Sequence, residues 1–202
     1  MASIKLKGDT SGEITISSPS VAGTNTLTLP ASTGTLATTA TSGKILQVVQ
    51  AVKTDSFSTA STSFVDITGL SVTITPSSTS SKILVSFNTH IGNAVYLSYL
   101  NLLRGSTSII VGDAEGSRPR VTSNSAGYGS DGTTDSAKYN PTPASMQYLD
   151  SPNTTSATTY KLQIKTYSAS HIAVINRNAV NLNYANFDPK SPSTITVMEV
   201  GA

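Results

Sequence analysis

The sequence contains no cysteine, few charged residues and no long hydrophobic run. Without cysteine the chain has no disulfide, no thiolate metal site and no cysteine nucleophile. Even the longest apolar runs are short, such as Ile109–Val111, so we expect no membrane insertion. The first seven residues lack the apolar segment of a signal peptide. The net charge is only +2, and lysine and arginine are spread along the chain without a cluster. We therefore expect no nucleic-acid partner, since binding a polyanion needs clustered basic residues.

Charged residues make up 12% of the chain, about half the usual share of a soluble domain. Serine and threonine, roughly 30% of the chain, take their place. Runs of strong helix formers are missing, whereas threonine favours strands, and serine, glycine, asparagine and proline favour turns. The composition therefore predicts an all-β protein. Few charges also suit a surface covered by neighbouring subunits, although a solvated surface rich in hydroxyl groups would have the same composition.

Residues 1–43 differ from the rest of the chain. Two short alternating segments, Glu13–Ile16 and Thr26–Leu29, are each followed by a turn with proline, and Gly34–Ala37 repeats the pattern weakly. Such short strands bury little on their own and need partners from elsewhere. A flexible linker would not need this regular alternation. We therefore interpret residues 1–43 as an extended β arm that attaches the protein to something else.

From Lys44 onward the pattern is that of an antiparallel β domain, 44–202. Lys82–Ile91 alternates cleanly, with Ile83, Val85 and Phe87 on one face, and turn residues recur at the spacing expected of a sandwich or barrel. We predict an antiparallel β-sandwich of the jelly-roll type. Its expected strands are Ile45–Lys53, Phe64–Ile67, Ser71–Thr75, Lys82–Ile91, Val95–Arg104, Thr107–Gly112, Ser145–Asp150, Thr159–Tyr167, His171–Asn176 and Thr194–Val200.

Two loops are candidates for recognition. The first, Asp113–Pro143, is rich in glycine, serine and asparagine, and the second is Arg177–Pro192. Long loops on rigid β scaffolds often carry binding, and aromatic side chains make good contacts. Packing of these loops against a neighbouring subunit is an equal alternative. The candidate recognition residues are Tyr128, Tyr139, Tyr184 and Phe187.

No motif in the chain predicts catalysis, a cofactor or a metal. Gly127–Gly132 has the spacing of a dinucleotide fingerprint but lacks the preceding strand and following helix that the chemistry requires. The same segment nearly matches a nucleophile elbow, yet the available bases, His90 and His171, lie in strand-like segments. Asp150 and Asp188 could be imagined as a glycosidase pair, but so could any two carboxylates, and the two histidines and scattered carboxylates form no metal signature. We expect a protein that is not an enzyme.

The N-terminal segments Gly12–Ile16, Thr26–Pro30 and Gly34–Leu36 resemble the arm of fibre-like proteins from tailed bacteriophages, especially marine and cyanobacterial phages. Further segments are similar to the same group in the same order, and together they cover nearly the whole chain. They are Gly43–Gln50, Asp66–Pro76, Leu103–Thr107 with Gly112–Asp113, Tyr148–Pro152, Ile175–Arg177 and Ser193–Val200.

This resemblance implies a trimeric head similar to C1q/TNF-like jelly rolls, tethered to the virion by the arm. The expected function is that of a structural virion protein, a tail fibre or appendage subunit made in the host cytoplasm that helps host attachment. The expected partners are two further copies of the chain, other virion proteins bound through residues 1–43, and a host-surface glycan or protein. Two alternatives stay open: a decoration or cement protein that stabilises the capsid shell, and a carbohydrate-active spike enzyme.

Overall fold

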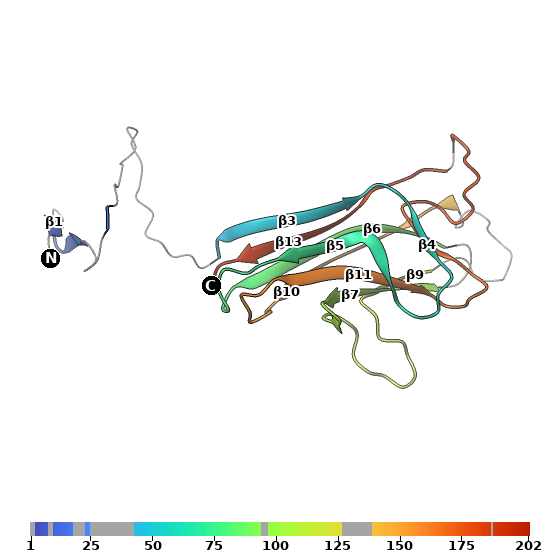
Figure 1. The fold of residues 1–202 in the computed structure, drawn as a ribbon, viewed down its shortest axis with the longest axis horizontal. Coiled ribbons are helices and arrows are strands. Elements are labelled where there is room, and N and C mark those ends of the chain that lie inside the picture. Colours follow the sequence, from blue (N-terminus) through green and yellow to red (C-terminus); the bar gives the residue numbers. More distant parts are fainter. Residues whose placement is uncertain are drawn as a thin grey trace. The chain divides into compact units, whose positions relative to one another are not determined.

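The computed structural model describes residues 3–7, 10–17, 23–24, 43–93, 97–126, 139–186 and 188–202. The chain divides into two compact units, Met1–Thr39 and Ala40–Ala202 (Figure 1). The regular elements in the described ranges are β strands that pair antiparallel. None of the described segments forms a helix of the length and apolarity needed to cross a bilayer. The expected segments Thr26–Leu29 and Gly34–Ala37 lie outside the described residues.

The first unit contains one β-hairpin. Strand β1 (Ser3–Lys7) pairs with β2 (Glu13–Ser17), so that Ile4 stands opposite Ile16 and Lys5 opposite Thr15. Gly12, with φ of 81°, occupies the left-handed region just before β2, where a side chain would be strained. The sequence predicted β2 but not β1, because the two lysines of Ser3–Lys7 are more typical of a polar chain terminus than of a strand.

The second unit is a sandwich of two antiparallel sheets, which confirms the predicted fold class (Figure 1). The first sheet places β3 beside β13, β13 beside β6, and β6 beside β10. The second places β5 beside β11, β11 beside β7, and β7 beside β9. The strands are β3 (Ile45–Lys53), β5 (Val65–Ile74), β6 (Lys82–Asn93), β7 (Leu97–Arg104), β9 (Ser123–Ala126), β10 (Thr142–Asp150), β11 (Thr158–Thr166) and β13 (Ser193–Val200).

Numbered along the chain, these eight strands are ordered 1-8-3-6 in one sheet and 2-7-4-5 in the other. This is the strand order of a jelly roll, in which two Greek keys wrap around one core. Three short strands extend it. β12 (Ala173–Ile175) pairs with the last residues of β6, beyond the first residues of β13. β4 (Phe57–Thr59) pairs with β12, and β8 (Thr107–Ser108) pairs with the end of β7.

Three local predictions were wrong. The expected pair Phe64–Ile67 and Ser71–Thr75 is one strand, β5, in which Thr68 and Gly69 bulge outward while Ile67 and Leu70 stay buried. Gly69 adopts a φ of 88° at the bulge. The expected strand Thr107–Gly112 ends at Ser108, and β9 lies within the expected loop Asp113–Pro143.

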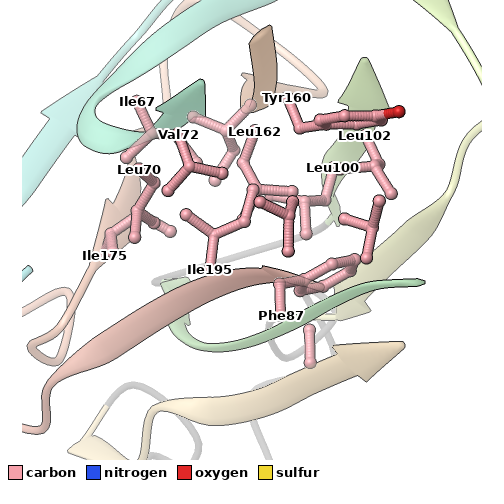
Figure 2. Close-up of a cluster of buried hydrophobic side chains, with 14 of the residues drawn as sticks. Ile67, Leu70, Val72, Phe87, Leu100, Leu102, Tyr160, Leu162, Ile175 and Ile195 are labelled. Carbon is pink, nitrogen blue, oxygen red and sulfur yellow. The ribbon is translucent and has the colours of Figure 1, made fainter. Parts of the chain in front are cut away.

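The core lies between the two sheets (Figure 2). Ile67, Leu70 and Val72 of β5 face Phe87 of β6 and Ile195 of β13, and all five side chains are at most 5% exposed. Burial of an aliphatic or aromatic side chain of this size contributes about 1.5 to 3 kcal/mol. The remaining labelled core residues come from β7, β11 and β12: Leu100, Leu102, Tyr160, Leu162 and Ile175.

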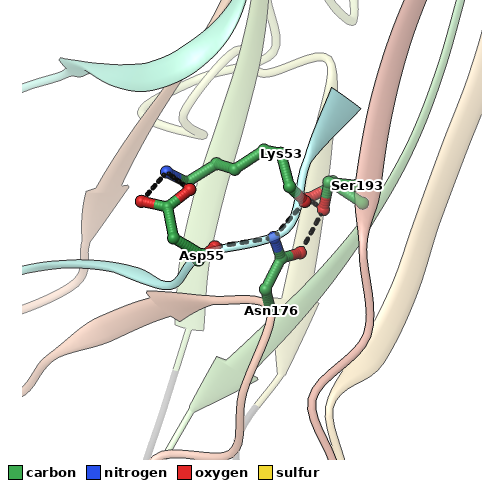
Figure 3. A network of polar contacts seen from close by, with 5 residues as sticks. Lys53, Asp55, Asn176 and Ser193 are labelled. Carbon is green, nitrogen blue, oxygen red and sulfur yellow. Dashed lines mark hydrogen bonds and ion pairs between the residues drawn. The ribbon is translucent and has the colours of Figure 1, made fainter. Parts of the chain in front are cut away.

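One asparagine fixes the junction of β3, β12 and β13 (Figure 3). The Asn176 amide donates to the backbone oxygens of Lys53 and Asp55, at 2.7 and 2.9 Å. Its side-chain oxygen accepts from Ser193, while Lys53 Nζ lies 2.9 Å from Asp55 Oδ1. Asn176 also has a φ of 68°, a conformation that asparagine tolerates better than branched residues. Asn176 therefore ties the start of the segment after β12 to the first sheet.

Candidate interaction surfaces

The four predicted recognition residues are only partly placed. Tyr128 and Phe187 lie outside the described residues. Tyr139 is half-buried and precedes β10, whereas Tyr184 is 56% exposed in the segment between β12 and β13. A recognition role for these residues stays a prediction.

Hydrogen bonds attach the segment between β8 and β9 to β7. The Thr122 hydroxyl donates to the oxygen of Ile110 and accepts from the backbone nitrogen of Leu102, at 2.6 and 2.9 Å. Asn101 accepts from the backbone nitrogen of Thr122 at 3.3 Å. Ile109 and Ile110 pack against the core. The first part of the expected recognition loop is thus fastened to β7 at its base.

The outward face of the first sheet carries an apolar row that crosses all four strands. Strand pairing places Val48 opposite Met198, Met198 opposite Leu84, and Leu84 opposite Leu149. Val48 is 55% and Leu149 47% exposed. We call the outward positions of β3, β13, β6 and β10 the uncharged face, because Lys82 is their one charged residue. The face comprises Val48, Gln50, Val52, Lys82, Leu84, Ser86, Asn88, His90, Pro143, Ser145, Gln147, Leu149, Thr194, Thr196, Met198 and Val200.

An open hollow of about 480 Å³ lies beside the apolar row on the uncharged face. Ser86 and Asn88 of β6, Ser145 and Gln147 of β10, and Thr194 of β13 line it, with Phe87 and Met146 completing the lining. On the edge strand β3, Val48 and Val52 project from the same face, and each is more than half exposed. The uncharged face therefore combines this projecting pair of valines, which we call the ridge, with a hollow.

The outward face of the second sheet is different. Asp66 of β5 accepts from Lys161 and Gln163 of β11 at 2.8 and 2.7 Å, and the Lys161 contact chiefly lowers the pKa of Asp66. Lys165 lies over the rings of Phe64 and Tyr99, with its nitrogen 4.9 and 5.3 Å from the ring centres. Charged groups paired in this way are typical of a solvated face. The two outward faces of the sandwich therefore differ in their charged groups.

The carboxylates and histidines considered for chemistry have structural partners. Asp150 is 4% exposed, and Arg104 Nη1 lies 2.8 Å from each of its oxygens. The Tyr160 hydroxyl donates to Asp150 at 2.7 Å; burial first, and then this carboxylate, raise the pKa of Tyr160. Because Asp150 belongs to β10 while Arg104 and Tyr160 belong to the second sheet, this cluster joins the two sheets.

Asp188 and the two histidines lie apart from that cluster. Asp188 accepts from the backbone nitrogen of Asn183 at 2.6 Å, and His90 Nδ1 lies 3.2 Å from the oxygen of Pro192. His171 follows β11, and its backbone nitrogen donates to Ser168. Among the described ranges, histidine, aspartate and glutamate side chains nowhere form a group of three suited to a metal ion. Gly127–Gly132, with its near-match to a nucleophile elbow, lies outside them.

The residues of the uncharged face were missed by sequence reasoning as a set. Alternation in Lys82–Ile91 places Leu84 on the face away from the core-facing Ile83, so the sequence alone predicts that Leu84 points outward. The row itself was not, because it depends on the register of four strands that are distant in the chain. Neither Leu149 nor Met198 gives a local sequence signal of its own.

Comparison with known proteins places this chain in no family: no family model matches, and neither does any curated protein. Among solved structures, the chain is similar to the VP2 subviral particle of infectious bursal disease virus. That similarity has 16% sequence identity and a TM-score of 0.35, and covers 88% of this chain but only 42% of the VP2 chain. A similarity of this size identifies neither a family nor a function.

Proposed function

We propose that this chain is a non-enzymatic structural subunit of a tailed-phage particle, a fibre or appendage protein that acts as a homotrimer. Residues 1–43 attach it to another virion protein, and the sandwich contributes to binding at the host surface. The observation that carries the proposal is the uncharged face, whose apolar row Val48–Met198–Leu84–Leu149 has exposed ends and a half-buried middle in a single chain. The resemblance of the sequence to phage fibre proteins supplies the setting.

The composition of the uncharged face supports self-association. Interface centres are depleted in charged residues, because each charge would have to lose its water. Lys82 lies at the margin of the face, where its nitrogen is 3.3 Å from Ser151 Oγ. Elsewhere the face offers aliphatic groups, whose burial is favourable, and hydroxyls and amides, which can be buried where they form hydrogen bonds across the contact. A second sheet face with paired charges remains for solvent or a receptor.

The arrangement of ridge and hollow favours a ring over a two-fold dimer. Val48 and Val52 project from the edge strand β3, while the hollow on the same face begins at Thr194 of β13, next to Val52, and extends across β6 to β10. A ridge that enters the hollow of the next copy makes a head-to-tail contact, and head-to-tail contacts generate closed rings when the rotation permits. A trimer is the smallest such ring.

The mass of the purified chain in solution tests this directly. Light scattering during gel filtration at micromolar concentration should give three times the mass of one chain. Val48→Asp should dissociate the trimer, weakening association by at least about 100-fold, because burying an unpaired carboxylate costs several kcal/mol. Ser71→Asp is the matched control: it adds the same charge on the outward face of the second sheet, and its oligomer should persist.

Two outcomes would contradict the assembly proposal. One is a wild-type chain that elutes as a monomer, and the other is a Val48→Asp trimer as stable as the wild type. Val48 is 55% exposed, so the substitution leaves the core of the single chain intact, and a folded-state spectrum checks this.

The place of the chain in a particle is tested with a deletion. Removal of residues 1–40 should abolish incorporation into particles, while the remaining sandwich still forms trimers. Unchanged incorporation would overturn the attachment role of the arm. If the isolated sandwich binds host cells, the fibre function is supported. Shell destabilisation in particles lacking the chain, without loss of adsorption, would instead establish a cement protein, and release of sugar from host glycans would establish an enzyme.

A further inference from the structure

The hairpin β1–β2 has one aliphatic face that is open to solvent. Ile4 is 64%, Leu6 53% and Ile16 47% exposed, and Ile4 pairs directly with Ile16 across the two strands. The alternating positions carry the polar groups. Lys5 Nζ lies 2.7 Å from Glu13 Oε1, and Thr15 stands opposite Lys5. The hairpin therefore has an aliphatic face and a charged face.

A two-stranded hairpin of this size needs a partner. Isolated hairpins are marginally stable in water at best, because two strands bury too little surface to offset the loss of chain entropy. Covering the aliphatic side chains would stabilise each hairpin by about 0.8 kcal/mol per buried methylene group. The alternation of the sequence at Ser3–Lys7 and Glu13–Ser17 is thus explained only when something covers this face.

We propose that the aliphatic faces of the hairpins from the copies within one oligomer pack against one another. This inference rests on the self-association proposed above. Ile4, Leu6 and Ile16 offer no polar or charged group with which to select a foreign surface. An identical aliphatic face is complementary to them, and packing it leaves Lys5, Lys7 and Glu13 directed to solvent.

The short tether between hairpin and sandwich makes the hairpin of another copy in the same oligomer the most available partner. Residues 18–42, which separate β2 from Gly43, number 25, so a fully extended chain reaches about 90 Å at most. Hairpins tethered to one oligomer are confined within a sphere of that radius, which corresponds to an effective concentration on the order of 0.5 mM or above. A weak aliphatic contact forms at such an effective concentration, whereas it would not form between separate chains at micromolar concentration.

The absence of cysteine from the chain provides a direct test. A single introduced cysteine can form a disulfide only with another copy. Leu6→Cys places the thiol on the aliphatic face, and Thr15→Cys places it on the charged face of the same hairpin. After mild oxidation of the purified full-length chain, Leu6→Cys should run on a non-reducing denaturing gel mostly as covalent dimer, approaching two thirds of the chains in a trimer. Thr15→Cys should give less than a quarter of that yield.

A second variant separates packing from random collision of tethered arms. Ile16→Asp in the Leu6→Cys background should reduce the disulfide yield to that of Thr15→Cys, because the carboxylate breaks the aliphatic contact. Equal yields for Leu6→Cys, Thr15→Cys and the double variant would overturn the inference. The mass of each sample in solution distinguishes the two proposals. A trimer without selective Leu6 crosslinks overturns only the hairpin packing, and a monomer overturns both.

Discussion

Glu199 is a fully buried carboxylate at the end of β13, on the side of the strand that faces the core. Its Oε1 accepts from the backbone nitrogen and the hydroxyl of Ser77, at 2.7 and 2.6 Å, and its Oε2 accepts from Gln47. Burial by itself raises the pKa of Glu199, but these hydrogen bonds outweigh it and hold the pKa at about 2. The ionised side chain thereby fixes the turn between β5 and β6 to the first sheet.

Glu199 should make the sandwich sensitive to acid. Because the folded-state pKa lies below the ordinary value of 4.5, its contribution to stability is present above pH 4.5 and is lost as the pH falls towards 2. Glu199→Gln should lower the free energy of unfolding by about 2 kcal/mol at pH 7 and by much less at pH 2.5. Urea unfolding at the two pH values measures the difference.

The exposed Glu115, paired with Arg118 at the surface, provides the control for that measurement. Glu115→Gln should change the free energy of unfolding by less than about 0.5 kcal/mol at either pH. A Glu199→Gln variant that is as stable as the wild type at pH 7 would contradict the assigned role of the carboxylate.

At the scale of the strand, alternation in the sequence predicted the long strands well. Lys82–Ile91 and Ile45–Lys53 were expected within two residues of β6 and β3, because one side of each faces the core. β5 was divided in two because Gly69 reads as a turn, although in the structure it forms a bulge inside one strand. β9 has the sequence Ser-Asn-Ser-Ala and no apolar alternation, so only its pairing with β7 makes it a strand.

Gly92 in β6 is required by the close approach of another segment. A Cβ atom at this position would overlap the backbone oxygen of Arg177 and lie 3.1 Å from Asn178 Cα. Gly92→Ala should therefore displace the segment after β12 and lower the free energy of unfolding by about 2 to 3 kcal/mol. Gly112→Ala is the matched control, because nothing lies within 4 Å of its Cβ position, and thermal unfolding of the two variants compares them. Equal melting temperatures would show that the segment yields without strain.

For the whole molecule, composition predicted an all-β protein, and strand alternation with the spacing of turn residues predicted the sandwich. The candidate surfaces were less accessible. Tyr184 was chosen because it is aromatic and lies in a loop, and its exposure agrees with that choice without testing it. The apolar row through Leu84 depends on which strands become neighbours, and this is decided by the long-range topology of the jelly roll, to which a single sequence gives no direct access.

The sandwich should fold without the arm. Every core residue that the structure describes, partly buried ones included, lies between Val49 and Val197. A chain comprising residues 43–202 should therefore unfold cooperatively, with a free energy of unfolding within about 1 kcal/mol of that of the full chain in its sandwich transition. Calorimetry or urea unfolding of the two chains, both carrying Val48→Asp to remove the effect of association, makes the comparison. Loss of the cooperative transition in the shorter chain would contradict it.

The sandwich begins and ends at the same place. Gly43 N donates to Gly201 O at 2.7 Å, and Gly201 N donates to Lys44 O at 2.8 Å, so the chain enters and leaves beside the start of β3 (Figure 1). Neighbouring ends of this kind make a domain portable. The sandwich could be spliced into a surface loop of an unrelated carrier protein without stretching the host backbone. A cargo fused after Ala202 would likewise emerge next to Gly43, where the sandwich begins.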